Sequence, residues 1–164
     1  MINNFKMFAR YNAWANDRLY EAAAALSDAQ YNADCRAFFK SMNGTLNHIL
    51  VADLVWMGRF ENTNGAPRKL DANLHEEFSA LRSARIEMDQ HIIDYCDGLS
   101  RKQVEGSITY TPITILEEVT IELAPALSHV FNHQTHHRGQ SHAILTQLTG
   151  EAPAIDLIYY NIAR

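Results

Sequence analysis

Apolar side chains recur every three or four residues along four long stretches of the chain, which is the spacing of amphipathic helices. We predict these helices over residues 2–26, 42–62, 74–97 and 125–148. Ser41 precedes the second stretch, where its hydroxyl suits a helix N-cap. Pro125 suits the first turn of the last stretch, and Gly98 and Gly150 stand where glycine commonly ends a helix.

Shorter elements are expected between and after these helices. Ser27 with Gln30, and Ser100 with Gln103, match the capping box that opens a helix. We therefore expect one short helix after each serine, and a further short helix at the end of the chain, over residues 156–163.

The segment from residue 107 to residue 123 has a different composition, rich in β-branched and aromatic side chains. This composition predicts two short strands, at 107–111 and 117–122, that form a hairpin. The alternative is a helix, because Leu116, Glu117 and Glu118 are also compatible with one.

Together these elements predict an all-α protein: a four-helix bundle with a short β-hairpin or extended insertion before the last long helix. The length of 164 residues suits one domain, spanning 1–164, and no linker suggests a second. In bundles, metal and ligand sites are built from side chains on facing helices.

Composition and charge exclude several classes of function. Fourteen basic against nineteen acidic residues leave a net charge of −5, and no basic run offers contacts to nucleic-acid phosphates. Met1 opens onto a mixed polar pattern and no apolar run could span a bilayer, so we expect neither a signal peptide nor a membrane anchor. Cys35 and Cys96 are isolated, which indicates free thiols in a cytoplasmic protein.

Four of the eight histidines fall between His129 and His137. At about 100° per residue, a helix places five polar side chains of this region on one face. They are His129, His133, His136, His137 and Gln140. Burying such a face is costly unless something satisfies it, and two imidazoles four residues apart can bind one ion. The alternative is a solvated face, with His129 and His136 turned outward.

The spacing excludes zincin-type peptidase chemistry. A zincin helix needs a glutamate directly after the first histidine as general base, and here that position holds Gln134. A pair of histidines needs a third ligand, and His48 and Asp53 on the second long helix are both candidates. Spacing alone does not decide between them.

Other polar residues have ordinary structural interpretations. His75, His91 and His142 are single histidines of the kind that one hydrogen bond satisfies. Arg59, Arg85 and Arg138 are able to bind an anionic substrate through a planar guanidinium, but such arginines are more often ion-paired within the protein.

The chain resembles the DinB family of bundle metalloproteins, and four segments carry the resemblance. They are Tyr11–Leu19, Gly44–Asp53, His129–Gln140 and Asp156–Tyr160, in the order expected of that family. The family name refers to damage-induced expression and not to DNA binding, which agrees with the acidic charge.

The resemblance implies a dimeric four-helix bundle with a divalent metal ion, zinc or nickel, held by three histidines. His48 matches the ligand on the second helix, and His133 and His137 match the pair on the last helix. Related proteins include thiol-dependent S-transferases and an isomerase that uses a low-molecular-weight thiol.

We therefore expect a metal-dependent enzyme that acts on a small-molecule substrate, with the ion activating a thiol or water. The alternative is a non-catalytic bundle that binds a metal or a small ligand.

Overall fold

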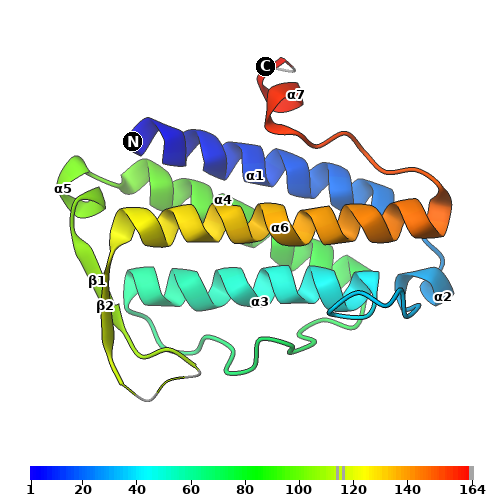
Figure 1. Ribbon diagram of the computed structural model, residues 1–164, viewed down its shortest axis with the longest axis horizontal. Coiled ribbons are helices and arrows are strands. Elements are labelled where there is room, and N and C mark those ends of the chain that lie inside the picture. The colour runs from blue at the N-terminus through cyan, green and yellow to red at the C-terminus, as the bar shows by residue number, and fades with distance from the viewer. Residues whose placement is uncertain (114, 116, 163–164) are drawn as a thin grey trace.

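The computed structural model describes residues 1–113, 115 and 117–162, and four long helices form its body. They are α1 (Ile2–Ala23), α3 (Met42–Glu61), α4 (Phe78–Gly98) and α6 (Leu123–Thr149). Each of α1 and α3 packs against both α4 and α6 (Figure 1). This arrangement confirms the predicted helical bundle.

A long crossover connection follows α3. The chain leaves α3 at one end of the bundle, runs back along the outside of that helix over residues 62–77, and enters α4 at the opposite end (Figure 1). Consequently α3 and α4 run in the same direction, and the crossover segment covers the outer side of α3.

Five shorter elements complete the described chain. They are α2 (Asp28–Tyr31), α5 (Arg101–Val104), β1 (Ser107–Tyr110), β2 (Val119–Glu122) and α7 (Leu157–Ile162). Both capping boxes are present: Ser27 with Gln30 opens α2, and Ser100 with Gln103 opens α5.

The predicted hairpin is confirmed. Its two strands pair antiparallel, with Ser107 opposite Glu122 and Tyr110 opposite Val119, and β2 leads directly into α6. The alternative prediction was a helix that included Leu116, and this residue lies outside the described residues.

Several helix boundaries differ from the sequence prediction by a few residues. The first helix ends at Ala23, before the predicted residue 26. The third begins at Phe78 and not at residue 74, because the backbone N–H groups of Leu74 and His75 donate to the side-chain oxygen of Asn47 on α3. Gly98 is the last residue of α4 and has no positive φ, in contrast to Gly150 with φ 82°. The prediction for residue 163 lies outside the described residues.

Polar side chains cross the middle of the bundle in what we call the core polar layer. Arg85 of α4 forms ion pairs with Asp53 at 2.6 Å and with Asp89 at 3.0 Å. Gln134 donates to the same Asp53 carboxylate. The layer consists of Asn12, Asn16, Asp53, Arg85, Asp89, Gln134 and Arg138, all of them buried.

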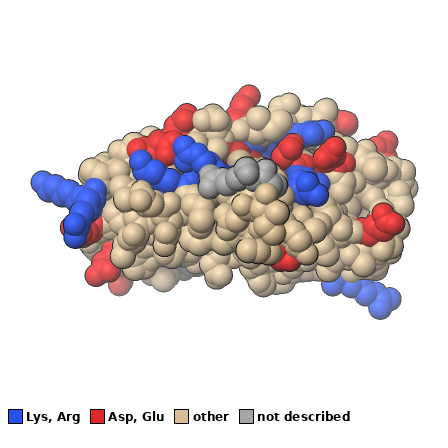
Figure 2. Space-filling view, turned by 90° about the horizontal axis from the view of Figure 1, so that it is seen from above, with Lys and Arg blue, Asp and Glu red and all other residues tan. Residues whose placement is uncertain are grey.

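Both cysteines are free, as predicted: Cys35 is half-buried and Cys96 is buried in the core. Among the described residues, no helix is long and apolar enough to cross a membrane. Seen from the side of α7, charged side chains gather along one long edge and leave much of that face uncharged (Figure 2).

Candidate metal centre

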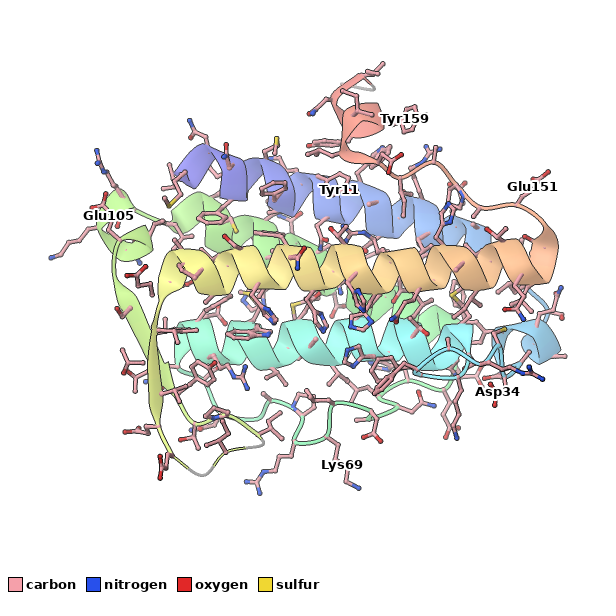
Figure 3. The ribbon with its side chains drawn as sticks, viewed as in Figure 1. Tyr11, Asp34, Lys69, Glu105, Glu151 and Tyr159 are labelled. Carbon is pink, nitrogen blue, oxygen red and sulfur yellow. The ribbon has the colours of Figure 1, made fainter. Side chains whose placement is uncertain are left out.

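Three histidines meet between α3 and α6, and we call them the histidine group: His48, His133 and His137. Each offers one ring nitrogen, and these three atoms lie within 4.8 Å of one another. Figure 3 shows nitrogen-bearing side chains filling the space between the two helices. His133 and His137 lie one turn apart on α6, and their ring centroids are separated by 4.3 Å.

His48 is oriented by the crossover segment. Its Nδ1 lies 2.7 Å from the carbonyl oxygen of Leu70. A carbonyl only accepts, so Nδ1 carries the proton and Nε2 keeps its lone pair. That Nε2 atom faces Nε2 of His133 at 3.3 Å.

His137 is oriented in the same manner by a neighbour on its own helix. Its Nδ1 lies 2.8 Å from the side-chain oxygen of Gln140, whose amide nitrogen in turn lies 3.1 Å from Nε2 of His136. With Nδ1 donating to Gln140, Nε2 of His137 is left as an acceptor. Hydrogen bonds of this kind on the outer ring nitrogen are typical of histidines that bind metals.

The donor set fits a divalent ion. In a tetrahedral site with metal–nitrogen bonds near 2.0–2.1 Å, two ligand nitrogens are roughly 3.3 Å apart. The Nε2 atoms of His48 and His133 are separated by 3.3 Å. Three imidazoles leave a fourth position open, which is the arrangement of catalytic rather than structural zinc.

The electrostatics also favour a cation. Desolvation, together with the neighbouring imidazoles, lowers the pKa of His133 to about 3. Desolvation lowers the pKa of His137 to about 4, against the hydrogen bond with Gln140, which raises it. The pKa of His48 is lowered by the same cause. All three rings are therefore neutral at pH 7, the form that binds a metal.

An aromatic side chain covers the histidine group from the segment before α3. The ring of Phe39 stacks on His48, with centroids 3.8 Å apart and an interplanar angle of 17°. A close backbone contact makes this possible, since a Cβ added to Gly44 would lie 2.2 Å from the carbonyl oxygen of Phe39. Only glycine allows the segment to approach α3 so closely.

Asn47 holds the crossover segment in place. Its side-chain oxygen accepts the N–H groups of Leu74 and His75, and its amide nitrogen donates to the carbonyl of His75 at 3.0 Å. Through this segment it supports the Leu70 carbonyl that orients His48. Sequence reasoning missed these positioning roles. Gly44 and Asn47 lie inside a segment that carried the family resemblance, but Phe39 and Leu70 gave no signal.

Of the two candidates for the third ligand, His48 and Asp53, the structure places only His48 beside the histidine pair of α6. Asp53 points into the core polar layer, where Arg85 and Gln134 bind its carboxylate, and it does not join the histidine group. Gln134 occupies the zincin glutamate position and is fully buried, which agrees with the exclusion of that chemistry.

The other histidines of α6 and the three candidate anion-binding arginines differ in their exposure. His129 and His136 are exposed on the flanks of the α6 face. Arg85 is ion-paired, and Arg138 is buried and donates to Asn12. Arg59 is only half-buried and lies beside the histidine group.

His91 and His75 lie outside the histidine group and make ordinary structural contacts. His91 lies 2.6 Å from a carboxylate oxygen of Glu61 at the surface. The backbone of His75 is bound by Asn47.

Two cavities meet at the histidine group. One, of about 240 Å³, is lined by His48 and His133 together with Trp56, Arg59, Ile113 and His129. The other, of about 550 Å³, is lined by His48 and His137 together with Phe38, Phe39, His136 and Gln140. Small molecules therefore have two approaches to the same three rings.

Comparison with known proteins agrees with this geometry. The family model described as "DinB family" matches residues 1–163. The chain is also 27% identical over 149 residues to Protein DinB from Bacillus subtilis (strain 168), an alignment that covers 87% of this chain and 84% of that relative.

Proposed function

Since this chain belongs to the DinB family, we propose that it is a divalent-metal-dependent enzyme, a transferase or isomerase that uses a low-molecular-weight thiol. In this proposal His48, His133 and His137 hold the ion, which is zinc or nickel. The observation that carries the proposal is the convergence of three neutral imidazoles whose ring nitrogens lie within 4.8 Å of one another.

The ion would supply Lewis-acid chemistry, lowering the pKa of a thiol or water so that it becomes a nucleophile at neutral pH. The protein's own residues provide orientation. Leu70 and Gln140 fix the tautomers of His48 and His137, so that both present a lone pair to the same point.

The two cavities suit a reaction between two small molecules. Phe39 stacks on His48 and excludes water from one side of the ring. Phe38 and Phe39 line the larger cavity, and their rings form a surface for an apolar electrophile. The smaller cavity would then hold the thiol.

Metal analysis of protein purified without a histidine tag tests the first step. We expect one divalent ion per chain, and a turnover screen with several thiols and a chromogenic electrophile should then detect a metal-dependent reaction. Failure to bind zinc or nickel at stoichiometric levels would overturn the proposal. Stoichiometric metal without turnover of any thiol would favour a binding protein.

We also propose that the protein forms a homodimer. Exposed apolar side chains on α7 support this, with Ile158 60%, Tyr159 49% and Ile162 72% exposed. Light scattering at micromolar concentration should give twice the mass of 18.6 kDa, and a monomer mass would contradict the proposal.

A further inference from the structure

Arg59 differs from the other arginines near the bundle core. Its guanidinium carbon lies 4.5 Å from the ring centroid of Trp56 and 4.2 Å from that of Tyr110. Arg85, by contrast, is held by two carboxylates. Within the described part of the chain, Arg59 forms no ion pair with an acidic side chain, so it is a partly desolvated charge without a counter-ion.

The stacked geometry leaves the edge of the guanidinium as its binding surface. Aromatic rings cover the planar group, while its N–H donors lie around the edge. An edge of this kind binds a carboxylate or a phosphate through two parallel hydrogen bonds. Burial lowers the pKa of Arg59, which reflects the desolvation of this charge. An anion at the edge would compensate for it.

Arg59 also lies in the smaller cavity that reaches the histidine group. His48, Ala52, Val55 and Arg59 follow one another at helical spacing on α3, and all four line this cavity. Eleven residues of helix place the Cα atoms of His48 and Arg59 roughly 16 Å apart. Side chains on a helix lean toward its N-terminus, and the guanidinium of Arg59 lies over Trp56, three residues earlier on the His48 side.

Nearby charges do not compete for this position. Lys69 of the crossover segment points away from α3 (Figure 3). Arg59 also lines a neighbouring cavity with Arg68 and Glu118, and it forms no ion pair with the Glu118 carboxylate. The walls next to Arg59 are largely apolar, with Val55, Pro112 and Ile113 among them.

We propose that Arg59 is the anion-recognising residue of this site, and that it binds the carboxylate or phosphate of a small organic reactant whose reactive group meets the histidine group. The assignment of this ligand as a reactant rests on the proposed function. The binding of an anion by Arg59 does not, because the stacked guanidinium is in place without the ion.

Direct binding tests the proposal with phenylacetate, phenyl phosphate and the uncharged phenylacetamide as probes. Fluorescence of Trp56 reports binding in a Trp14→Phe background, since the chain has two tryptophans. We expect one or both anions to bind more tightly than the amide, and the comparison of the two anions identifies the preferred group. Arg59→Met should weaken anion binding about tenfold, a typical effect of losing a charge-assisted hydrogen bond, and leave the amide unchanged.

Arg68→Met is the matched control, because Arg68 is an exposed arginine of the adjoining cavity and should change anion binding less than twofold. Equal binding of anions and amide by the parent protein, or unchanged anion binding in Arg59→Met, would overturn the proposal. Metal content is measured on the same samples. If Arg59→Met loses anion binding in a protein that never holds metal, the anion site stands and the proposed enzyme function fails.

Discussion

The bundle contains two buried polar clusters, and they satisfy their polar groups in different ways. In the core polar layer, the positive charge of Arg85 meets two carboxylates, and their proximity raises its pKa despite the opposing effect of burial. In the histidine group, three like rings direct ring nitrogens toward one point, and no carboxylate of the described residues belongs to the group.

This difference separates a structural cluster from a functional one. A buried ion pair balances its own charges and holds helices together. His48 and His137 already have their outer nitrogens hydrogen-bonded, so each has a free lone pair only on the inner side, which a cation can use. The comparison predicts that substitutions in the two clusters affect different measurable properties.

The largest expected effect is on metal binding. His133→Ala removes one of the three rings and should abolish stoichiometric zinc or nickel, while the free energy of unfolding of the apoprotein changes comparatively little. His142→Ala, on another face of α6, should leave the metal content intact. Metal analysis after dialysis measures both. Retention of one ion per chain by His133→Ala would contradict the assignment of the site.

The second effect is on stability. Asp53→Ala leaves the Arg85 charge with one carboxylate fewer in the core, and breaking a buried pair in this manner costs about 3–5 kcal/mol. Urea unfolding of the metal-free protein measures it. Asp17→Ala is the control, because its pair with Arg82 at 3.6 Å is exposed and should contribute little. Equal stability of the two variants would show that the core polar layer is not structural.

A pair of glycines tests the cover over the histidine group. Gly44→Ala introduces a Cβ that would meet the Phe39 carbonyl at 2.2 Å, so the segment must move and the Phe39 ring leave His48. We expect a loss of about 1–3 kcal/mol in stability and weaker metal binding.

The control is Gly139→Ala, at an exposed position of α6 where an added Cβ meets nothing within 4 Å. It should stabilise the protein by about 0.5–1 kcal/mol, because alanine is the better helix former. Urea unfolding and chelator competition measure both variants. A Gly44→Ala protein as stable as the parent would show that Phe39 is not held by this contact.

A further effect is on the pH dependence of the apoprotein. The pKa values of His133 and His137 in the folded state, about 3 and about 4, lie below the ordinary value near 6.5. The unfolded chain therefore binds protons first as the pH falls. The contribution of the neutral rings is present above pH 6.5 and is lost as the pH falls toward 4.

Urea midpoints measured from pH 7 to pH 4 should therefore decrease, and His133→Asn should decrease less steeply. Identical pH slopes for the parent and the variant would mean that His133 is not desolvated in the folded protein.

The sequence alone determined the helices and two of the three members of the histidine group. Apolar spacing located the four long helices because each must bury one stripe against its neighbours. The interval between His133 and His137 placed both rings on one face without any knowledge of the fold. The capping boxes at Ser27 and Ser100 could also be predicted, because each joins residues only three positions apart.

Only the tertiary structure decided which residue of α3 completes the group. His48 and Asp53 are five residues apart and point about 140° away from each other around the helix. The packing of α3 turns the first toward α6 and the second toward Arg85 of α4. The contributions of Phe39 and Leu70 also required the fold, since both come from irregular segments. One segment approaches α3 closely at Gly44, and the other is held by the hydrogen bonds of Asn47. These contacts join irregular segments to a helix, so no periodic pattern along the chain records them.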